Sequence, residues 1–299
     1  MDFKNKLINW YSIHKRELPW RSTENPYYIW LSEIILQQTQ VKQGLPYYNA
    51  FVKKYPSVFD LARASEEEIL KLWQGLGYYS RARNLHTTAK HIAYDLNGVF
   101  PNNYNALLKL KGVGDYTASA IASIAFNEVA AVVDGNVYRV LARYYGIDTP
   151  INLTAGIKEF KTLASSLIDE QQPATYNQAI MEFGARQCKP KNPDCTTCPL
   201  KDGCVSLQKN LVNVLPIKLK KTKIITKYFN FLVCVDKDKK VLFEKRVGKG
   251  IWQNLYQFPL IESKKSLSVN EFHLLNLENT ALVSNEFDYS LYNETDKVH

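Results

Sequence analysis

A glutamate in an apolar stretch is the first side chain of this sequence that could do acid–base chemistry. Glu33 and Ser32 are the only polar residues in the run 29–36, which otherwise consists of Ile, Leu and Trp. On a helix, Glu33 would share a face with Trp30 and Leu36, which argues against the alternative that it points to solvent. Burial raises the pKa of a carboxyl group, and a raised pKa suits a general acid that works near neutral pH.

A second carboxylate stands where a helix is expected to begin. Asp134 ends the apolar run 129–133 and is followed by Gly135 and Asn136. An aspartate in this position is often only the N-cap of the helix, and this alternative stays open from the spacing alone. The other interpretation is a catalytic carboxylate in polar surroundings. The glycine hairpin upstream and the cysteine cluster downstream favour it.

Four cysteines follow one another in the segment 188–204. Their spacing is Cys-x6-Cys-x2-Cys-x5-Cys, and the four positions are Cys188, Cys195, Cys198 and Cys204. Four thiols so close together in an intracellular chain indicate a metal centre rather than disulfides. Zinc sites usually use paired Cys-x2-Cys units, and the uneven spacing fits a four-iron cluster better. Cys234 stands apart in an apolar strand and is expected to be a core residue.

A glycine hairpin precedes a helix that is rich in small residues. Gly112 and Gly114 flank Val113, and a helix is expected from about residue 116. Glycine permits positive φ and a close approach of the backbone to another molecule, and the first N–H groups of the helix have no partner within it. Such a hairpin is a site for phosphate, although the pattern is common and weak evidence by itself.

Aromatic, basic and amide side chains occur in three further stretches that could contact bases. Trp20 and Arg21 form a pair that could hold a base, or else a core Trp beside a solvated Arg. Tyr78 follows a second glycine turn and precedes Arg81 and Arg83, which fits wedging and phosphate contact, or an ordinary helix corner. Neutral hydrogen-bonding side chains suited to probing bases lie at Gln37, Gln38, Thr39 and Gln40.

The composition agrees with a nucleic-acid partner. The 299 residues carry a net charge of +9. This charge favours a polyanionic partner such as nucleic acid, although a basic surface without such a partner would carry it as well. No apolar run is long enough for a membrane span, and the start of the chain has no signal-peptide core, so we expect a cytoplasmic protein without membrane contact.

The expected organisation is two domains. Residues 1–210 should be helical, with helices at 2–16, 101–110 and 174–187 among others. A basic linker is expected at 211–227, and an α+β domain at 228–299 with strands at 228–235 and 240–245.

Residues 1–210 resemble the helix-hairpin-helix DNA glycosylases that carry an iron–sulfur cluster. Within that superfamily the chain is similar to adenine DNA glycosylases of the MutY type, through LPWR at 18–21, SEIILQQTQV at 32–41, GLGYYSRARNL at 75–85 and VDGNVYRVLAR at 133–143. GIWQNLYQFP at 250–259 resembles their Nudix-like domain. The resemblance implies a mostly α fold: a two-lobed glycosylase domain with an iron–sulfur loop, and a smaller, incomplete α+β Nudix-like domain.

The resemblance also implies a reaction and its partners. A monomeric, nucleoid-associated enzyme of bacterial type would remove adenine mispaired with 8-oxoguanine or guanine from double-stranded DNA. Glu33 would protonate adenine N7, and Asp134 would stabilise the oxocarbenium-like sugar. These roles require one carboxyl in apolar surroundings and one in polar surroundings. Tyr116 and Asn136 would orient the pair and the water.

The remaining implied roles concern binding. The adenine pocket would consist of Trp20, Arg21, Leu36 and Gln178. Gln38 and Tyr78 would enter the duplex, with Gln37 and Thr39 beside them. Gly112 and Gly114 would hold the DNA backbone, and a monovalent or divalent cation at this hairpin fits the family. One [4Fe-4S] cluster would be bound by Cys188, Cys195, Cys198 and Cys204.

Three other functions are less consistent with the residues. Endonuclease III needs a lysine nucleophile where this chain has Tyr116, and an amine is required to form a Schiff base. A Nudix pyrophosphohydrolase needs a glutamate-rich helix, which the sequence after Phe258 lacks. An inactive DNA-binding module would not need both Glu33 and Asp134. The family's Phe-Ser-His loop, which contacts 8-oxoguanine, is not found after residue 228.

Overall fold

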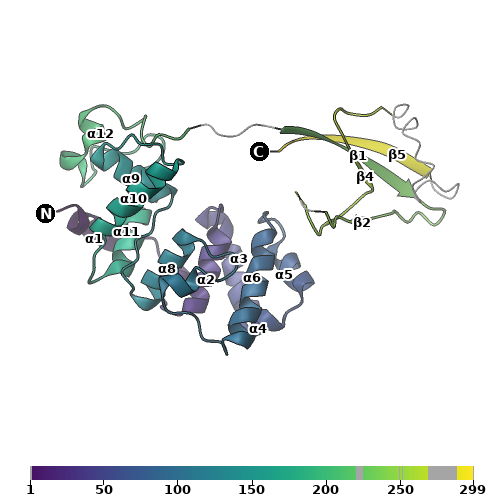
Figure 1. Cartoon of the computed structure of the whole chain (residues 1–299), viewed down its shortest axis with the longest axis horizontal. Helices are drawn as coiled ribbons and strands as arrows, with labels where there is room; N and C mark the ends of the chain where they lie inside the picture. Colours follow the sequence, from purple (N-terminus) through teal and green to yellow (C-terminus); the bar gives the residue numbers. More distant parts are fainter. Residues whose placement is uncertain (1, 220–224, 249, 251, 269–287, 299) are drawn as a thin grey trace. The chain divides into compact units, whose positions relative to one another are not determined.

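The computed structural model describes residues 2–219, 225–248, 250, 252–268 and 288–298. The chain divides into two units, Met1–Leu219 and Lys220–His299, which are described separately (Figure 1). The expected linker 211–227 and the domain limits beside it stay predictions, and residues 220–224 lie outside the described part. No helix in the described ranges is long and apolar enough to cross a membrane.

The first unit is helical throughout. Its main helices are α1 Phe3–His14, α2 Pro26–Leu36, α3 Val41–Lys54, α4 Val58–Arg63, α5 Glu66–Trp73, α6 Ser80–Lys90, α7 Tyr104–Leu107, α8 Asp115–Phe126, α9 Gly135–Tyr145, α10 Thr154–Leu167, α11 Pro173–Arg186 and α12 Val205–Gln208. Short helical turns lie at Pro19–Arg21, His91–Asp95 and Lys201–Gly203. The mostly α fold that the sequence predicted is confirmed.

Individual helix limits follow local capping. Asp2 caps α1 by accepting a hydrogen bond from the Asn5 amide at 2.9 Å, as expected for the first predicted helix. The predicted helix at 101–110 is too long, because α7 is only Tyr104–Leu107. Asn103 caps α7 through the Ala106 amide, and the chain turns again after Leu107, so residues 101–103 and 108–110 stay outside the helix.

Two hydrophobic cores give this unit its two lobes. One core gathers around α2 to α6 and includes Trp30, Phe51 and Trp73. The other gathers around α1 and α9 to α11 and includes Phe160 and Phe183. Helix α8 packs against both α2 and α11, and its small residues Ala118, Ser119, Ala120, Ala122 and Ser123 are all buried. Small side chains let α2 and α11 approach α8 closely. The cavity described below lies between the two lobes that α8 joins.

The second unit contains a small antiparallel sheet. The strand order is β4-β1-β5, with β1 Ile225–Val235, β4 Leu260–Ser263 and β5 Asp288–Val298, and Phe229 is opposite Glu262 and Glu294. The strand predicted at 240–245 is wrong for most of its length, because only Glu244–Lys245 of this range forms a strand, β2, which pairs with β3 Tyr256–Gln257, while Val241 makes an isolated bridge to Val235. Asp236 accepts hydrogen bonds from the amides of Asp238 and Lys240, which stabilises the turn that brings the Leu242 amide back to the Cys234 carbonyl of β1 at 3.1 Å. Cys234 is buried, as predicted, whereas the Nudix-like assignment stays a prediction.

Candidate active site

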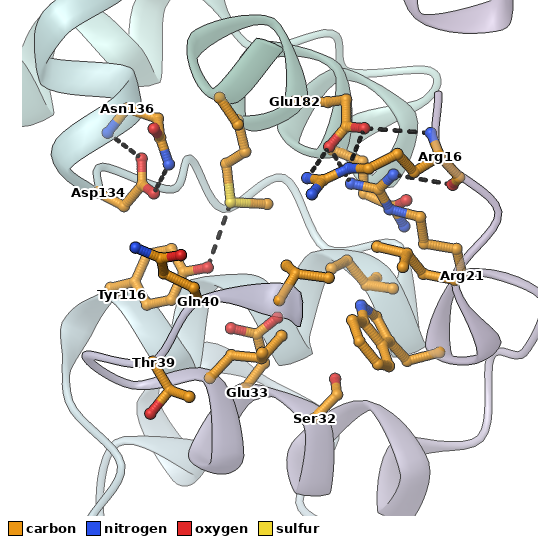
Figure 2. Close-up of a pocket in the computed structure, with 18 of the residues that line it drawn as sticks. Arg16, Arg21, Ser32, Glu33, Thr39, Gln40, Tyr116, Asp134, Asn136 and Glu182 are labelled. Carbon is orange, nitrogen blue, oxygen red and sulfur yellow. Dashed lines mark hydrogen bonds and ion pairs between the residues drawn. The ribbon is translucent and has the colours of Figure 1, made fainter. Parts of the chain in front are cut away.

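Glu33 lies on the buried face of α2 and lines a cavity of about 580 Å³ between the lobes (Figure 2). Asn25 caps the helix and Pro26 occupies its first position, where a missing N–H costs nothing. Residues Ile29 to Ile35 are then buried on every side of the helix. Because this stretch of the helix has no solvated face, Glu33 as a residue is only 8% exposed.

Asp134 is both the N-cap of α9 and part of the cavity wall. Its Oδ1 accepts hydrogen bonds from the amides of Asn136 at 2.9 Å and Val137 at 2.8 Å. Its Oδ2 accepts one from Nδ2 of Asn136 at 2.7 Å. The N-cap alternative is therefore correct without excluding the other, since the capping bonds fix the carboxylate at the edge of the cavity.

Burial affects both carboxyl groups. It raises the pKa of Glu33 to about 7, although a hydrogen bond from Tyr116 and the charge of Arg21 act in the opposite direction. Burial also raises the pKa of Asp134, against its hydrogen bonds from Val137 and Asn136. The expectation that Asp134 would lie in polar surroundings is thus only partly right. Hydrogen bonds to the charged form distinguish Asp134 from Glu33.

Tyr116 lies between the two carboxylates. Its hydroxyl donates to Sδ of Met181 at 3.2 Å (Figure 2) and is also within hydrogen-bonding reach of Glu33. Burial and the charges of Glu33 and Asp134 raise the pKa of this phenol well above its ordinary value. The phenol therefore stays protonated and can donate.

A buried cation–carboxylate cluster forms another part of the wall, and sequence reasoning had missed most of it. Glu182 accepts two side-chain hydrogen bonds from Arg16, at 2.7 and 2.6 Å, and one from Arg21 at 2.8 Å. Burial alone would raise the pKa of Glu182, but these bonds outweigh it and lower the pKa to about 2. The available signal was that Glu182 lies one helical turn after Gln178 on α11.

Most of the predicted site residues meet at the cavity. Trp20 is buried there with its ring edge against Tyr48, and Gln178 accepts a hydrogen bond from the Tyr11 hydroxyl at 2.6 Å. The predicted residues that line the cavity are Trp20, Arg21, Glu33, Leu36, Thr39, Gln40, Tyr116, Asp134, Asn136 and Gln178.

The other predicted contact residues lie outside the cavity lining. Gln38 is exposed, and so is Tyr78, at 69%. Nε2 of Gln37 donates to the Gly112 carbonyl at 3.4 Å, which links the end of α2 to the hairpin. Arg81 is buried and donates to backbone carbonyls, so the predicted phosphate contact is wrong for this residue.

The two hairpin glycines differ. Gly112 has φ +81°, as predicted, and a Cβ there would lie 2.8 Å from Cβ of Asn84. Gly114 has φ −96° and ψ −179°, so the expected positive φ is wrong at this position. Gly114 instead caps α8 in an extended conformation, and open space surrounds it. That space suits the approach of another molecule.

All four cysteines of the predicted metal centre line one small cavity, of about 30 Å³. Arg143 holds the loop by donating to the Lys189 carbonyl at 2.8 Å and to Sγ of Cys188 at 3.4 Å. In the described ranges, no three His, Cys, Asp or Glu side chains are arranged to hold a single metal ion. Ligands of a four-iron cluster bind separate iron atoms and lie further apart, so four thiols facing one cavity fit a cluster.

Arg139 connects this loop to the cavity. It donates to the Cys188 carbonyl at 2.8 Å and to Oδ1 of Asn136 at 2.9 Å. Asn136 in turn holds Asp134. Arg139 was not predicted, although it lies three residues after Asn136 on one helix face.

The fold and the paired carboxylates define a helix-hairpin-helix protein of base excision DNA repair. Residues 31–161 match the HhH-GPD superfamily of base excision DNA repair proteins. A solved thermostable thymine-DNA glycosylase superposes with a TM-score of 0.64 and 33% identity, covering 69% of this chain and 95% of that one. A trapped endonuclease III–DNA covalent intermediate shares the fold, with a TM-score of 0.60 and 23% identity over 70% of this chain and 95% of that one.

Sequence relatives narrow the assignment. The adenine DNA glycosylase of Buchnera aphidicola subsp. Baizongia pistaciae is 41% identical over 258 residues, which cover 86% of this chain and 73% of the relative. That of Homo sapiens is 43% identical over 216 residues, 69% of this chain and 40% of the relative. The chain belongs to the adenine DNA glycosylase family, of the MutY type.

Proposed function

We propose that this enzyme hydrolyses adenine from double-stranded DNA when it is mispaired with 8-oxoguanine or guanine, and leaves the strand intact. The observation that carries the proposal is that two carboxyl groups line one cavity. Glu33 is surrounded by apolar side chains, whereas Asp134 is hydrogen-bonded, and the neutral phenol of Tyr116 lies between them. Two carboxyls with separate environments are the usual equipment for cleaving a glycosidic bond.

Glu33 acts as the general acid. A pKa of about 7 keeps a large fraction of Glu33 protonated at neutral pH, so the group has a proton to give. Adenine is a poor leaving group as an anion, and protonation at N7 lets it depart neutral. Tyr116 donates to the carboxylate that remains.

Asp134 stabilises the sugar after the base departs. Its three hydrogen bonds favour the ionised form and fix its oxygens, so no reorganisation is needed when positive charge develops. Water then attacks the oxocarbenium-like carbon and gives a proton to the Glu33 carboxylate, which restores the acid, while Asn136 orients Asp134.

The flipped adenine is held by fixed side chains. Trp20 supplies an aromatic wall, and Glu182 holds the Arg21 guanidinium in one place. The hydrogen bond from Tyr11 fixes the orientation of the Gln178 amide. Extrusion of the base costs a few kcal/mol, which these contacts offset.

The cysteine loop is proposed to hold one [4Fe-4S] cluster through Cys188, Cys195, Cys198 and Cys204. The bound cluster would supply folding energy to the loop and no electrons, because hydrolysis needs none. Arg143 and Arg139 tie the loop to α9, and the exposed residues Lys189 and Lys191 suit phosphate contact.

The test uses the purified protein, which we expect to be monomeric, on duplexes with A:8-oxoguanine, A:G or an oxidised pyrimidine. We expect strand breaks at adenine only after alkali, and little borohydride-trapped adduct, since Tyr116 offers no amine. Among the described residues that line the cavity, the only lysine is Lys42, which is exposed. Efficient trapping and cleavage without alkali would contradict the monofunctional assignment.

A matched variant sharpens this test. Tyr116→Lys should gain a trappable Schiff base beside Asp134, because burial and the positive end of α8 would lower the pKa of the new amine. Equal rates on A:8-oxoguanine and A:G would show that residues 1–299 do not distinguish 8-oxoguanine from guanine. Iron analysis with zinc in place of iron would overturn the cluster.

A further inference from the structure

Arg81 is a buried cation without a carboxylate partner among the ion pairs of the described residues. Instead, its Nη1 lies within hydrogen-bonding distance of four oxygen atoms at and just after the end of α2, and its Nη2 lies within that distance of two oxygen atoms in a second segment. These acceptors are the carbonyls of Ile34 (3.3 Å), Ile35 (2.9 Å), Gln37, Leu76 (3.2 Å) and Gly77 (3.3 Å), and Oγ1 of Thr39 (3.2 Å). A planar group with five donors in a fixed fork is suited to bridging two backbone segments.

One of these segments is the glutamine loop, residues 37–40, at the end of α2. The last carbonyls of a helix have no partner within it and carry partial negative charge, so a cation there is favourable. Arg81 fills this place for the helix that carries Glu33. Gln38, an exposed residue of the loop, has φ +55°, an unusual conformation for a residue other than glycine.

The other segment is the tyrosine loop, residues 74–79. Tyr78 is 69% exposed and has φ +47°, so each loop carries one exposed residue other than glycine in the left-handed conformation. In both loops Arg81 binds the carbonyl directly before that residue, namely that of Gln37 and that of Gly77. The Arg81 guanidinium also lies 5.7 Å from the centre of the Tyr78 ring.

We propose that Arg81 is a positioning residue that fixes Gln38 and Tyr78 relative to each other, so that both enter the duplex together and extrude the adenine. Left-handed residues persist only where neighbouring contacts hold them, and Arg81 is the shared contact. The inference rests on the proposed function, in which these two side chains probe the DNA.

The test measures extrusion separately from chemistry. Duplexes carry 2-aminopurine in place of the target adenine, opposite guanine, and Glu33→Gln protein prevents excision. Fluorescence rises when 2-aminopurine leaves the stack. With Arg81→Met added to the Glu33→Gln protein, most of this fluorescence rise should be lost at saturating protein. In protein that keeps Glu33, Arg81→Met should slow single-turnover excision about 100-fold relative to wild type, as expected for a small misplacement of the target base.

Two further variants separate positioning from general stability. Arg81→Lys keeps the charge but lacks the fork, so it can serve one loop only, and we expect about tenfold slower excision with near wild-type thermal unfolding. Ile69→Val removes one methylene from the core of the same lobe without touching either loop, and it should leave both readouts unchanged.

The outcomes are distinguishable from failure of the proposed function. Wild-type protein that neither extrudes nor excises adenine would defeat the function itself. Wild-type activity together with normal extrusion and excision by Arg81→Lys would overturn the positioning role. The positioning role would also be overturned if the slower excision by Arg81→Lys were explained by its lower thermal stability, judged by how much excision slows per degree of destabilisation in Ile69→Val.

Discussion

Two buried glutamates line the same cavity, and their pKa values are shifted in opposite directions. Glu33 on α2 is 8% exposed and Glu182 on α11 is 1% exposed. The pKa of Glu33 is raised to about 7, whereas that of Glu182 is lowered to about 2. Figure 2 shows Arg16 and Arg21 bonded to Glu182, whereas among the described residues no ion pair involves Glu33. Burial raises the pKa of a carboxyl group only where bonded cations do not outweigh it.

Removing the proton donor tests this contrast most severely. Glu33→Gln should slow adenine excision by about 10³-fold or more, because the departing base is no longer protonated, while DNA affinity stays near wild type. Single-turnover excision and binding assays measure the two effects. Full activity of the variant would remove Glu33 from the mechanism.

Asp134→Asn extends the contrast to the hydrogen-bonded carboxylate. An amide can still cap α9, so the fold should persist, but the developing cation loses its counter-charge. We expect excision to fall by about 10²- to 10³-fold in single-turnover assays, with the thermal unfolding midpoint little changed. Similar activity of wild type and variant would show that Asp134 is only a cap.

The contrast also shows what a sequence can and cannot predict. The burial of Glu33 followed from its apolar neighbours on one helix, and the capping bonds of Asp134 followed from adjacent residues. The cluster around Glu182 joins residues 166 positions apart, and no local pattern announces such a pair. The same holds for Arg81, whose acceptors lie up to 47 positions away. Sequence periodicity predicts which face of a helix is buried, but it does not predict which cation binds which carboxylate or carbonyl oxygen.

Glu182→Gln should harm stability more than chemistry. It leaves two arginines without their carboxylate, and we expect a loss of about 3 kcal/mol in the free energy of unfolding, with weaker excision through a displaced Arg21. Glu68→Gln is the matched control, because Glu68 is exposed and glutamine can replace it in the capping box of α5. Equal unfolding curves for both variants would show that the buried pair contributes nothing.

The pH dependence of stability should carry opposite signs for the two glutamates. The folded state holds the Glu33 proton more tightly than the unfolded state, so this group reduces stability as pH rises from about 4.5 to about 7. Glu182 contributes stability above about 4.5 that is lost as pH falls toward about 2. Unfolding curves of Glu33→Gln and wild type should diverge with rising pH. Parallel curves would contradict the raised pKa.

The most direct test is the single-turnover rate of adenine excision from an A:8-oxoguanine duplex as a function of pH. If protonated Glu33 donates the proton, the rate should fall about tenfold per pH unit above an apparent pKa near 7, and it should fall again in acid as Asp134 becomes protonated. Glu33→Gln should lose this dependence along with most of its activity. A wild-type rate that stays constant well above pH 8 would contradict the assignment of Glu33 as the general acid.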